Sequence, residues 1–436
     1  MGADSVAYHE HTVLDRGDDH PGQALAYYAS RGETPLVWGG RGAGRLGLSG
    51  AVTHAQYAAV FGPGGACDPT TGARLVRTRR PGMELVVAAH KSVALLGLIG
   101  RAEDMHAILD AETDATLASL DSWVSRRGGR RGRGQSRSGT AGLTWARTRH
   151  ATSRAGDPAP HDHVLVANLV EMVDAWGGWK ALDTAALRDV LHAATAVGRV
   201  AAARRAVELG YAIEADAGPS GRLGHWRIAG VPREAEAVFS KRSAEIDALM
   251  DESGYATHRA RGVAARASRK RKGSTAPEQL LAGWQAELEA AGWPVPILDA
   301  SVRRAAAGRE PVAARLDDEE RRRLVAGLLA ADGPLARRKV FARTDVVVEA
   351  GPLVFGHDPA ELTKLVSATL ADAEVVPLVC VAAARDRVYT TAGVIAREAA
   401  IAAAVAERIE PGTGPVPRSQ RPSTPSAPRK ESWAGR

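Results

Sequence analysis

Cysteine is scarce in this chain, which has only Cys67 and Cys380 among 436 residues. Two cysteines far apart in sequence exclude a disulfide framework and a cysteine-rich metal site, so a reducing, cytoplasmic setting is expected. The first residues, MGADSVAYHEH, lack the basic and then apolar segments of a secretory signal. No run of 18 or more uncharged apolar residues occurs, so we expect a soluble protein without membrane insertion.

Acidic residues are outnumbered by basic ones, with 50 Asp and Glu against 57 Lys and Arg. The formal charge is +7 and the sequence pI is about 9.6. A basic chain favours polyanionic partners such as nucleic acid. The basic residues also cluster, because residues 126–137 and the RKRK run at 269–272 are rich in arginine and lysine.

The patterning predicts an α+β fold. Glycine and turn signals punctuate the chain up to about residue 75, apart from a possible helix at 22–29. An apolar strand at 83–87 then leads through His90, Lys91 and Ser92 into a possible buried helix, and residues 101–124 have the spacing of an amphipathic helix. Strands joined by short turns alternate with helices as far as residue 232, so we expect an antiparallel sheet flanked by helices.

The remainder of the chain is expected to be mainly helical. We expect a basic helical region at 251–335, a small helix-rich module with one or two strands at 336–410, and a tail at 411–436. The tail is rich in proline, serine and arginine and cannot bury enough apolar area to become ordered.

Three histidines lie close together in the segment RHATSRAGDPAPHDH, which ends in His161 and His163. Side chains alternate across a strand, so His161 and His163 point to one face while Asp162 points to the other. His150 ends a preceding strand-like segment, and the turn after it contains Gly156 and Pro158. Antiparallel pairing of the two strands would therefore bring His150 alongside the other two histidines.

Three imidazoles without a cysteine are typical of a catalytic divalent metal site with open coordination positions. An isolated His-x-His pair is more often two surface or core histidines, and the third histidine is what favours a metal. Mg²⁺, Mn²⁺ and Zn²⁺ remain open as the ion.

The segment RHATSRAGDPAPHDHVLVANLV resembles the three-histidine motif of MobF-class (TrwC/TraI-like) conjugative relaxases, which belong to the HUH endonucleases. Asp162 stands where that motif has a bulky apolar residue. Three further blocks are similar to the family in the same order along the chain. They are YYASRGETPLVWGGRGAGRLGLSG, MELVVAAHKSVALLGLIG and HWRIAGVPREAEAVFSKRSAEIDALM.

The resemblance implies a relaxase catalytic domain at 1–250 with the palm-like fold of HUH endonucleases. It implies nicking and strand transfer of single-stranded DNA at a transfer origin, through a tyrosine that forms a 5′-phosphotyrosyl bond and leaves a free 3′-hydroxyl. A phenolate is both a nucleophile and a competent leaving group, so the reaction is reversible. By the same resemblance, His150, His161 and His163 hold the metal ion.

The resemblance places the nucleophile at Tyr27 or Tyr28, ahead of Tyr8, which is all that remains of a first tyrosine pair. An alternative is that Tyr27 and Tyr28 pack a helix on the sheet, because adjacent helical residues cannot face one site. Glu84 occupies the place of a family aspartate, where it would accept a hydrogen bond from a ligand imidazole or from the tyrosine. An ordinary glutamate at a strand edge is the other interpretation.

Phosphate contacts are expected from basic side chains on loops and helix starts, which supply salt-dependent affinity without reading the base sequence. The candidates are Lys91, Arg126, Arg127, Arg130, Arg131, Arg133 and Arg154.

Larger members of the resembled family continue into a helicase, but this sequence has no GxxxxGK[ST] phosphate-binding loop. The resemblance therefore predicts a relaxase without its helicase, acting with accessory relaxosome proteins and a separate helicase. Two alternatives stay open. One is a rolling-circle replication initiator with the same chemistry, and the other is a catalytically inactive DNA-binding remnant.

Overall fold

The computed structural model describes residues 35–124, 140–153, 155–173, 177–217, 223–253, 277–309, 312–378 and 388–408. Several sequence predictions fall outside these ranges. They are the helix at 22–29, the arginine-rich segment 126–137, Arg154, the RKRK run at 269–272 and the tail at 411–436.

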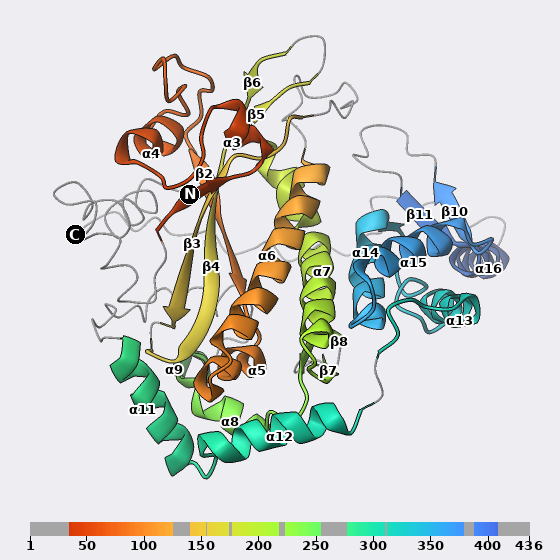
Figure 1. Cartoon of the computed structure of the whole chain (residues 1–436). Coiled ribbons are helices and arrows are strands. Elements are labelled where there is room, and N and C mark those ends of the chain that lie inside the picture. Colours follow the sequence, from red (N-terminus) through yellow and green to blue (C-terminus); the bar gives the residue numbers. More distant parts are fainter. Residues whose placement is uncertain are drawn as a thin grey trace, which may run out of the picture.

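The central element is a four-stranded antiparallel sheet (Figure 1). Its order is β1 (Val37–Gly39), β3 (Trp145–Thr152), β4 (Pro158–Ala167) and β2 (Gly82–Ala88). All three strand pairs are antiparallel. The predicted α+β class is thus confirmed, with the strand that carries His161 and His163 at an inner position.

Two long helices cover one face of this sheet, α6 (Ala102–Trp123) and α7 (Thr184–Glu208) (Figure 1). The amphipathic helix predicted at 101–124 is α6, and its apolar residues meet Val164 and Val166 of β4. A Cβ atom on Gly198 would lie 2.1 Å from Thr116 Oγ1, so glycine is what permits the close contact between the two helices.

Among the described residues, the opposite face is covered at one end, by α3 (Arg41–Arg45) and α4 (His54–Phe61). The expectation that this region lacks helices is wrong for residues 54–61. Thr53 and Gln56 form a capping box at the start of α4, and Tyr57 and Phe61 are buried with Leu165 of the sheet. These local signals outweigh the glycines that surround the segment.

After β2 the chain forms a short helix α5 (Lys91–Ala94) and a 3₁₀ helix η2 (Leu95–Ile99). These pack with the hairpin of β7 (Ile213–Ala217) and β8 (Leu223–Ile228), which the sequence predicted. The remaining elements of this part are β5 (Val170–Glu171), β6 (Trp179–Lys180), α8 (Arg233–Val238), α9 (Lys241–Ser253), α11 (Pro277–Ala290) and α12 (Val295–Ala307). Leu288 of α11 and Leu298 of α12 belong to the same core as η2.

The C-terminal part packs on α7 through a separate core that includes Ala193 and Val200. Its elements are α13 (Asp318–Leu329), β9 (Phe341–Ala342), α14 (Arg343–Ala350), η3 (Gly351–Val354), α15 (Pro359–Ala371), β10 (Val375–Leu378), β11 (Val388–Thr391) and α16 (Ala392–Arg408). Its sheet has three strands in the order β10, β11, β9, where the sequence predicted one or two. The additional strand has only two residues, too few for a periodic signal. The predicted domain boundaries themselves stay a prediction.

Among the described residues, no helix has the length and apolar character needed to cross a membrane.

Candidate active site

Three histidines converge on the face of the sheet that α6 and α7 leave uncovered. His150 of β3 lies directly opposite His161 of β4, and Thr148 lies opposite His163. One ring nitrogen from each histidine lies within 4.8 Å of the corresponding atoms of the other two. The cross-strand proximity expected from the sequence is therefore present in the structure.

The hydrogen bonds of two histidines orient their rings toward each other. His161 Nδ1 donates to the Ala159 carbonyl at 2.6 Å, and His163 Nδ1 donates to Glu84 Oε1 at 2.6 Å. Carbonyl and carboxylate oxygens are acceptors, so these contacts assign a proton to Nδ1 of both rings and turn Nε2 inward. The two Nε2 atoms are 3.1 Å apart.

This arrangement fits a bound cation. When neither Nε2 carries a proton, two lone pairs face each other at that separation, and an ion bonded to both would remove their repulsion. Two ligands of one ion with bonds of ~2.1 Å are about 3 Å apart, so the observed spacing needs little adjustment. His150 completes the donor set; it is only 3% exposed, and its ring centre is 4.4 Å from that of His163.

Glu84 lies on β2 opposite Leu165, two residues from His163 on the neighbouring strand and on the same face. The predicted contact with a candidate ligand imidazole is present, and the partner is His163. Carboxylates commonly orient metal-binding histidines in this way. Beside them Val86 is 54% exposed, so the described residues leave this part of the face accessible.

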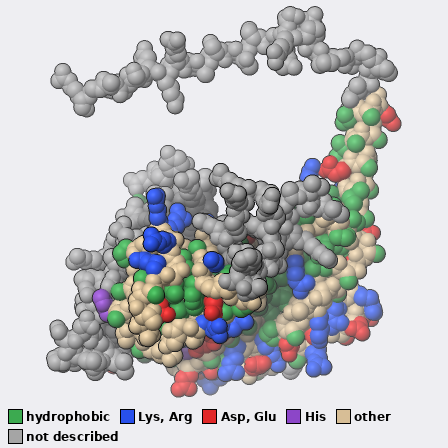
Figure 2. Space-filling view, turned by 90° about the horizontal axis from the view of Figure 1, so that it is seen from above, with side chains coloured by type: hydrophobic (Ala, Val, Ile, Leu, Met, Phe, Trp, Pro, Cys, Tyr) green, Lys and Arg blue, Asp and Glu red, His purple; other side chains and the backbone are tan. Residues whose placement is uncertain are grey.

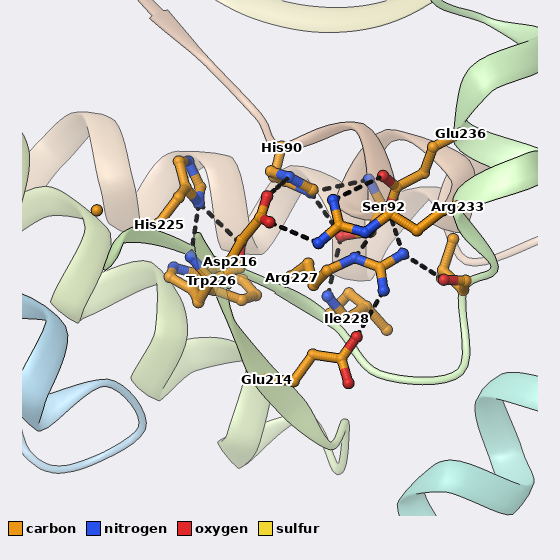
Figure 3. A network of polar contacts seen from close by, with 12 residues as sticks. His90, Ser92, Glu214, Asp216, His225, Trp226, Arg227, Ile228, Arg233 and Glu236 are labelled. Atoms are coloured by element: carbon orange, nitrogen blue, oxygen red, sulfur yellow. Dashed lines mark hydrogen bonds and ion pairs between the residues drawn. The ribbon is translucent and has the colours of Figure 1, made fainter. Parts of the chain in front are cut away.

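The end of β2 is held by a network of polar contacts (Figure 3). His90 Nε2 donates to Asp216 on β7 at 3.0 Å, and His90 Nδ1 accepts from Ser92 Oγ at 2.8 Å. Ser92 Oγ in turn accepts from the Ile228 backbone at 2.9 Å. These contacts join the strand that carries Glu84 to the β7–β8 hairpin.

Arginines extend the same network to α8. Arg233 contacts Asp216 at 2.6 Å, and Arg227 contacts Glu214 and Glu236 at 2.5 and 2.6 Å (Figure 3). Asp216 of β7 contacts both His90 and Arg233, and Glu236 of α8 contacts Arg227 of β8. These contacts hold the hairpin against α5 and α8.

His225 of this hairpin gives the protein a defined acid sensitivity. Burial, followed by the charge of Arg199, lowers the pKa of His225 to about 3 from 6.5. The native state therefore excludes a proton that the unfolded chain takes up below pH 6.5, so stability is lost as the pH falls from 6.5 toward 3. We expect this residue alone to cost about 3 kcal/mol of unfolding free energy between pH 6.5 and 4.

Urea unfolding at pH 6.5 and pH 4 measures this effect. His225→Asn should lose less stability across the interval than the wild-type protein, whereas His54→Asn on exposed α4 should behave like wild type. Equal acid sensitivity of the His225→Asn and wild-type proteins would contradict the assignment.

Lys91 starts α5, and its ammonium donates to the Pro158 carbonyl at 2.9 Å. Burial lowers the pKa of this ammonium. The contact joins α5 to the beginning of β4, so the described role of Lys91 is structural, and its phosphate contact stays a prediction.

The other predicted site residues lie outside the described ranges. They are Tyr8, Tyr27, Tyr28, Arg126, Arg127, Arg130, Arg131, Arg133 and Arg154. Their roles stay predictions.

A third basic cluster, which was not predicted from the sequence, is formed by Arg77, Arg79 and Arg80 immediately before β2. All three are exposed and line a pocket of about 860 Å³ that also includes Asn168, just after β4. Figure 2 looks onto the end of the molecule that is uppermost in Figure 1, where Lys and Arg side chains gather. The signal was present as the run RLVRTRR at 74–80.

Comparison with known proteins supports one family. The model of the TrwC relaxase family matches residues 2–291. The multifunctional conjugation protein TraI of Escherichia coli is 31% identical over 350 residues, which are 75% of this chain and 19% of that protein. TraI of strain K12 is 31% identical over 295 residues, or 63% of this chain and 16% of that protein. The chain thus spans about a fifth or less of the length of these relatives.

Solved structures agree with the sequence comparison. The conjugative relaxase TrwC in complex with oriT DNA, in a metal-bound structure, has a TM-score of 0.53 and 27% identity. That match covers 65% of this chain and 98% of the other. TrwC with a 27-mer DNA comprising the recognition hairpin and the cleavage site has a TM-score of 0.52, 27% identity and the same coverage. The family model matches about two thirds of the sequence, and the histidine cluster lies on an antiparallel sheet, so this chain belongs to the TrwC relaxase family.

Proposed function

We propose that this protein is a DNA relaxase, a metal-dependent enzyme that cuts one strand of DNA at a transfer origin and transfers it to initiate conjugative transfer. The observation that carries the proposal is the convergence of His150, His161 and His163 on the face of the sheet opposite α6 and α7, with Glu84 hydrogen-bonded to His163. Family membership and the solved TrwC–oriT DNA complexes support it.

The reaction is a transesterification at phosphorus. A tyrosine oxygen, from Tyr27 or Tyr28 ahead of Tyr8, forms a bond to phosphorus while the bond from phosphorus to the 3′-oxygen breaks. The phenolic proton is lost, the departing 3′-oxygen gains a proton, and the 5′-phosphate stays on the tyrosine. No water is consumed, so the strand remains competent for rejoining.

The histidines fix the place of this chemistry. The Ala159 carbonyl holds the Nδ1 proton of His161 and Glu84 holds that of His163, so Nε2 of both rings stays within the cluster of ring nitrogens. A divalent ion held there would supply positive charge to the non-bridging oxygens of the scissile phosphate. Mg²⁺, Mn²⁺ and Zn²⁺ are the candidates for that ion.

Glu84 is expected to act through His163. Glu84→Gln removes the carboxylate charge that raises the basicity of the imidazole, and we expect about tenfold weaker metal affinity. Calorimetric titration of the purified chain with Mn²⁺ measures it, with Glu208→Gln at the end of α7 as the control. Unchanged affinity in Glu84→Gln would favour the interpretation of Glu84 as an ordinary strand-edge residue.

The cluster of Arg77, Arg79 and Arg80 is proposed to contact DNA phosphates. Alanine at all three positions should weaken binding of single-stranded DNA and lower the slope of log K against log salt by about 2, since each lost contact removes about 0.7. Fluorescence anisotropy across a salt series measures both quantities. Removing the same charge from exposed Arg315, Arg322 and Arg323 should leave the slope unchanged, and equal effects of the two triple variants would show that only net charge matters.

The remaining partners are also proposals. Accessory relaxosome proteins and a helicase activity are proposed to act together with the chain, in keeping with its membership of the TrwC relaxase family. A cytoplasmic location is proposed, in keeping with the low cysteine content.

Single-stranded oligonucleotides tiled across the neighbouring DNA test the proposal. Incubation with the full chain and Mg²⁺ or Mn²⁺ should give a protein–DNA band that survives denaturation, for one oligonucleotide and one strand only. Binding without any covalent band, with every metal tried, would instead identify an inactive DNA-binding remnant.

A further inference from the structure

A buried ion pair lies directly behind the histidines, on the face of the sheet that is covered by α6. Asp162, between His161 and His163, is 0% exposed. Arg149, next to His150, donates from Nε to Asp162 Oδ1 at 2.7 Å and from Nη2 to Asp162 Oδ2 at 2.8 Å. A charged pair inside a sheet–helix interface is costly to desolvate, so its presence calls for an explanation.

The ion pair joins β3 and β4, the two strands that carry the histidines, at the position next to the histidine pair. Arg149 lies opposite Asp162 in the strand register, and the adjacent opposed residues are His150 and His161. Because side chains alternate along a strand, the Arg149–Asp162 pair lies on one face of β3 and β4, and the His150–His161 pair lies on the other face. The two-pronged contact between Arg149 and Asp162 therefore favours the register that places His150 against His161.

The register needs such a constraint at this point. The pairing of β3 and β4 becomes irregular between His150 and Thr152, immediately beyond the histidine. A slip by one residue would turn the slipped strand's side chains to the other face and separate His150 from the other two histidines. On its other side β4 pairs regularly with β2 from Gly82 to Ala88, so β3 is the strand that requires an additional link.

The pair is also attached to α6. Thr113 Oγ1 donates to Asp162 Oδ2 at 2.7 Å, and Arg149 Nη2 donates to Asp110 Oδ1 at 2.8 Å. Arg147 Nε lies 3.2 Å from Asp162 Oδ2. The two residues of α6 that make these contacts are one helical turn apart and face the sheet together.

We propose that Arg149 and Asp162 are positioning residues, which hold the strand register that brings the three histidines to one metal ion. This inference rests on the proposed metal site. It assigns a role to the polar residue at the centre of the His-x-His motif, where the resembled pattern has a bulky apolar side chain. The pair acts from the face of the sheet opposite the histidines, and its role is carried through the strand register.

The double variant Arg149→Met/Asp162→Val tests the role, because it removes both charges together and leaves no unpaired ion in the interior. The affinity of the full chain for Mn²⁺ alone is measured by electron paramagnetic resonance of free Mn²⁺, alongside the melting temperature. The expected result is a folded protein with affinity 10 to 100 times weaker than wild type. Asp114→Asn is the control, because Asp114 pairs with Arg147 on the same interface but not with Arg149.

The outcomes separate this inference from the metal site itself. A folded double variant with wild-type affinity would overturn the positioning role while leaving the metal site in place. A wild-type chain that binds no Mn²⁺, Mg²⁺ or Zn²⁺ would overturn the metal site and the inference with it. Should the double variant melt below the assay temperature, the titration is repeated at a lower temperature at which the variant is folded, and wild-type affinity there overturns the role.

Discussion

Replacing His161 by alanine is expected to abolish metal binding and to slow DNA strand cleavage by about 10³, which corresponds to about 4 kcal/mol of transition-state stabilisation. His161 Nε2 faces the cluster and lies 3.1 Å from His163 Nε2. Its removal leaves two imidazoles, which is too few for a tight site with open positions. The effect on folding should be small, because His161 is only partly buried.

The measurement has two parts, the affinity for Mn²⁺ and the rate at which a cleavable oligonucleotide forms a covalent band. His192→Ala on the exposed side of α7 is the control and should match wild type in both. Chelation of the wild-type protein with EDTA should reproduce the His161→Ala rate, and added Mn²⁺ should restore only the wild-type enzyme. A His161→Ala protein with the wild-type cleavage rate would remove the metal from the mechanism.

Loss of the nucleophile is expected to have the largest effect of all. Phenylalanine at whichever of Tyr27 and Tyr28 is the nucleophile should eliminate the covalent band, because its ring has no oxygen that could bond to phosphorus. Tyr8→Phe should have the smaller effect. DNA affinity should change little in each case, since one hydroxyl contributes little beside many phosphate contacts.

Denaturing gels of the three single variants, together with mass spectrometry of the cross-linked peptide, identify the tyrosine. Tyr389→Phe on β11 of the C-terminal part is the control. A covalent band that persists when Tyr8, Tyr27 and Tyr28 are all phenylalanine would show that the nucleophile has been assigned to the wrong residues.

The histidine cluster was predictable because it depends on short-range geometry. Alternation within β4 places His161 and His163 on one face, and the turn after β3 brings back His150 from only eleven residues away. The prediction therefore required no knowledge of contacts between residues that are distant in the sequence. The same local logic predicted α6 and the β7–β8 hairpin, whose periodicity is strong.

Contacts between distant segments were beyond the sequence. The position of Glu84 was expected, but the choice between an imidazole and a tyrosine as its partner required the pairing of β2 with β4. The partners of Asp162 come from β3 and from α6, 49 residues away in the case of Thr113. The basic cluster at 77–80 was overlooked because a short arginine run carries no information about the pocket that it lines.

The most direct test of the central claim uses a cleavable oligonucleotide labelled separately at its 5′ and 3′ ends, incubated with the wild-type protein and Mn²⁺. A 5′-phosphotyrosyl intermediate predicts that the 3′-labelled fragment stays on the protein after denaturation and that the 5′-labelled fragment is released with a free 3′-hydroxyl. Release of both labels, as in hydrolysis, or retention of the 5′-labelled fragment would contradict a tyrosine transesterase.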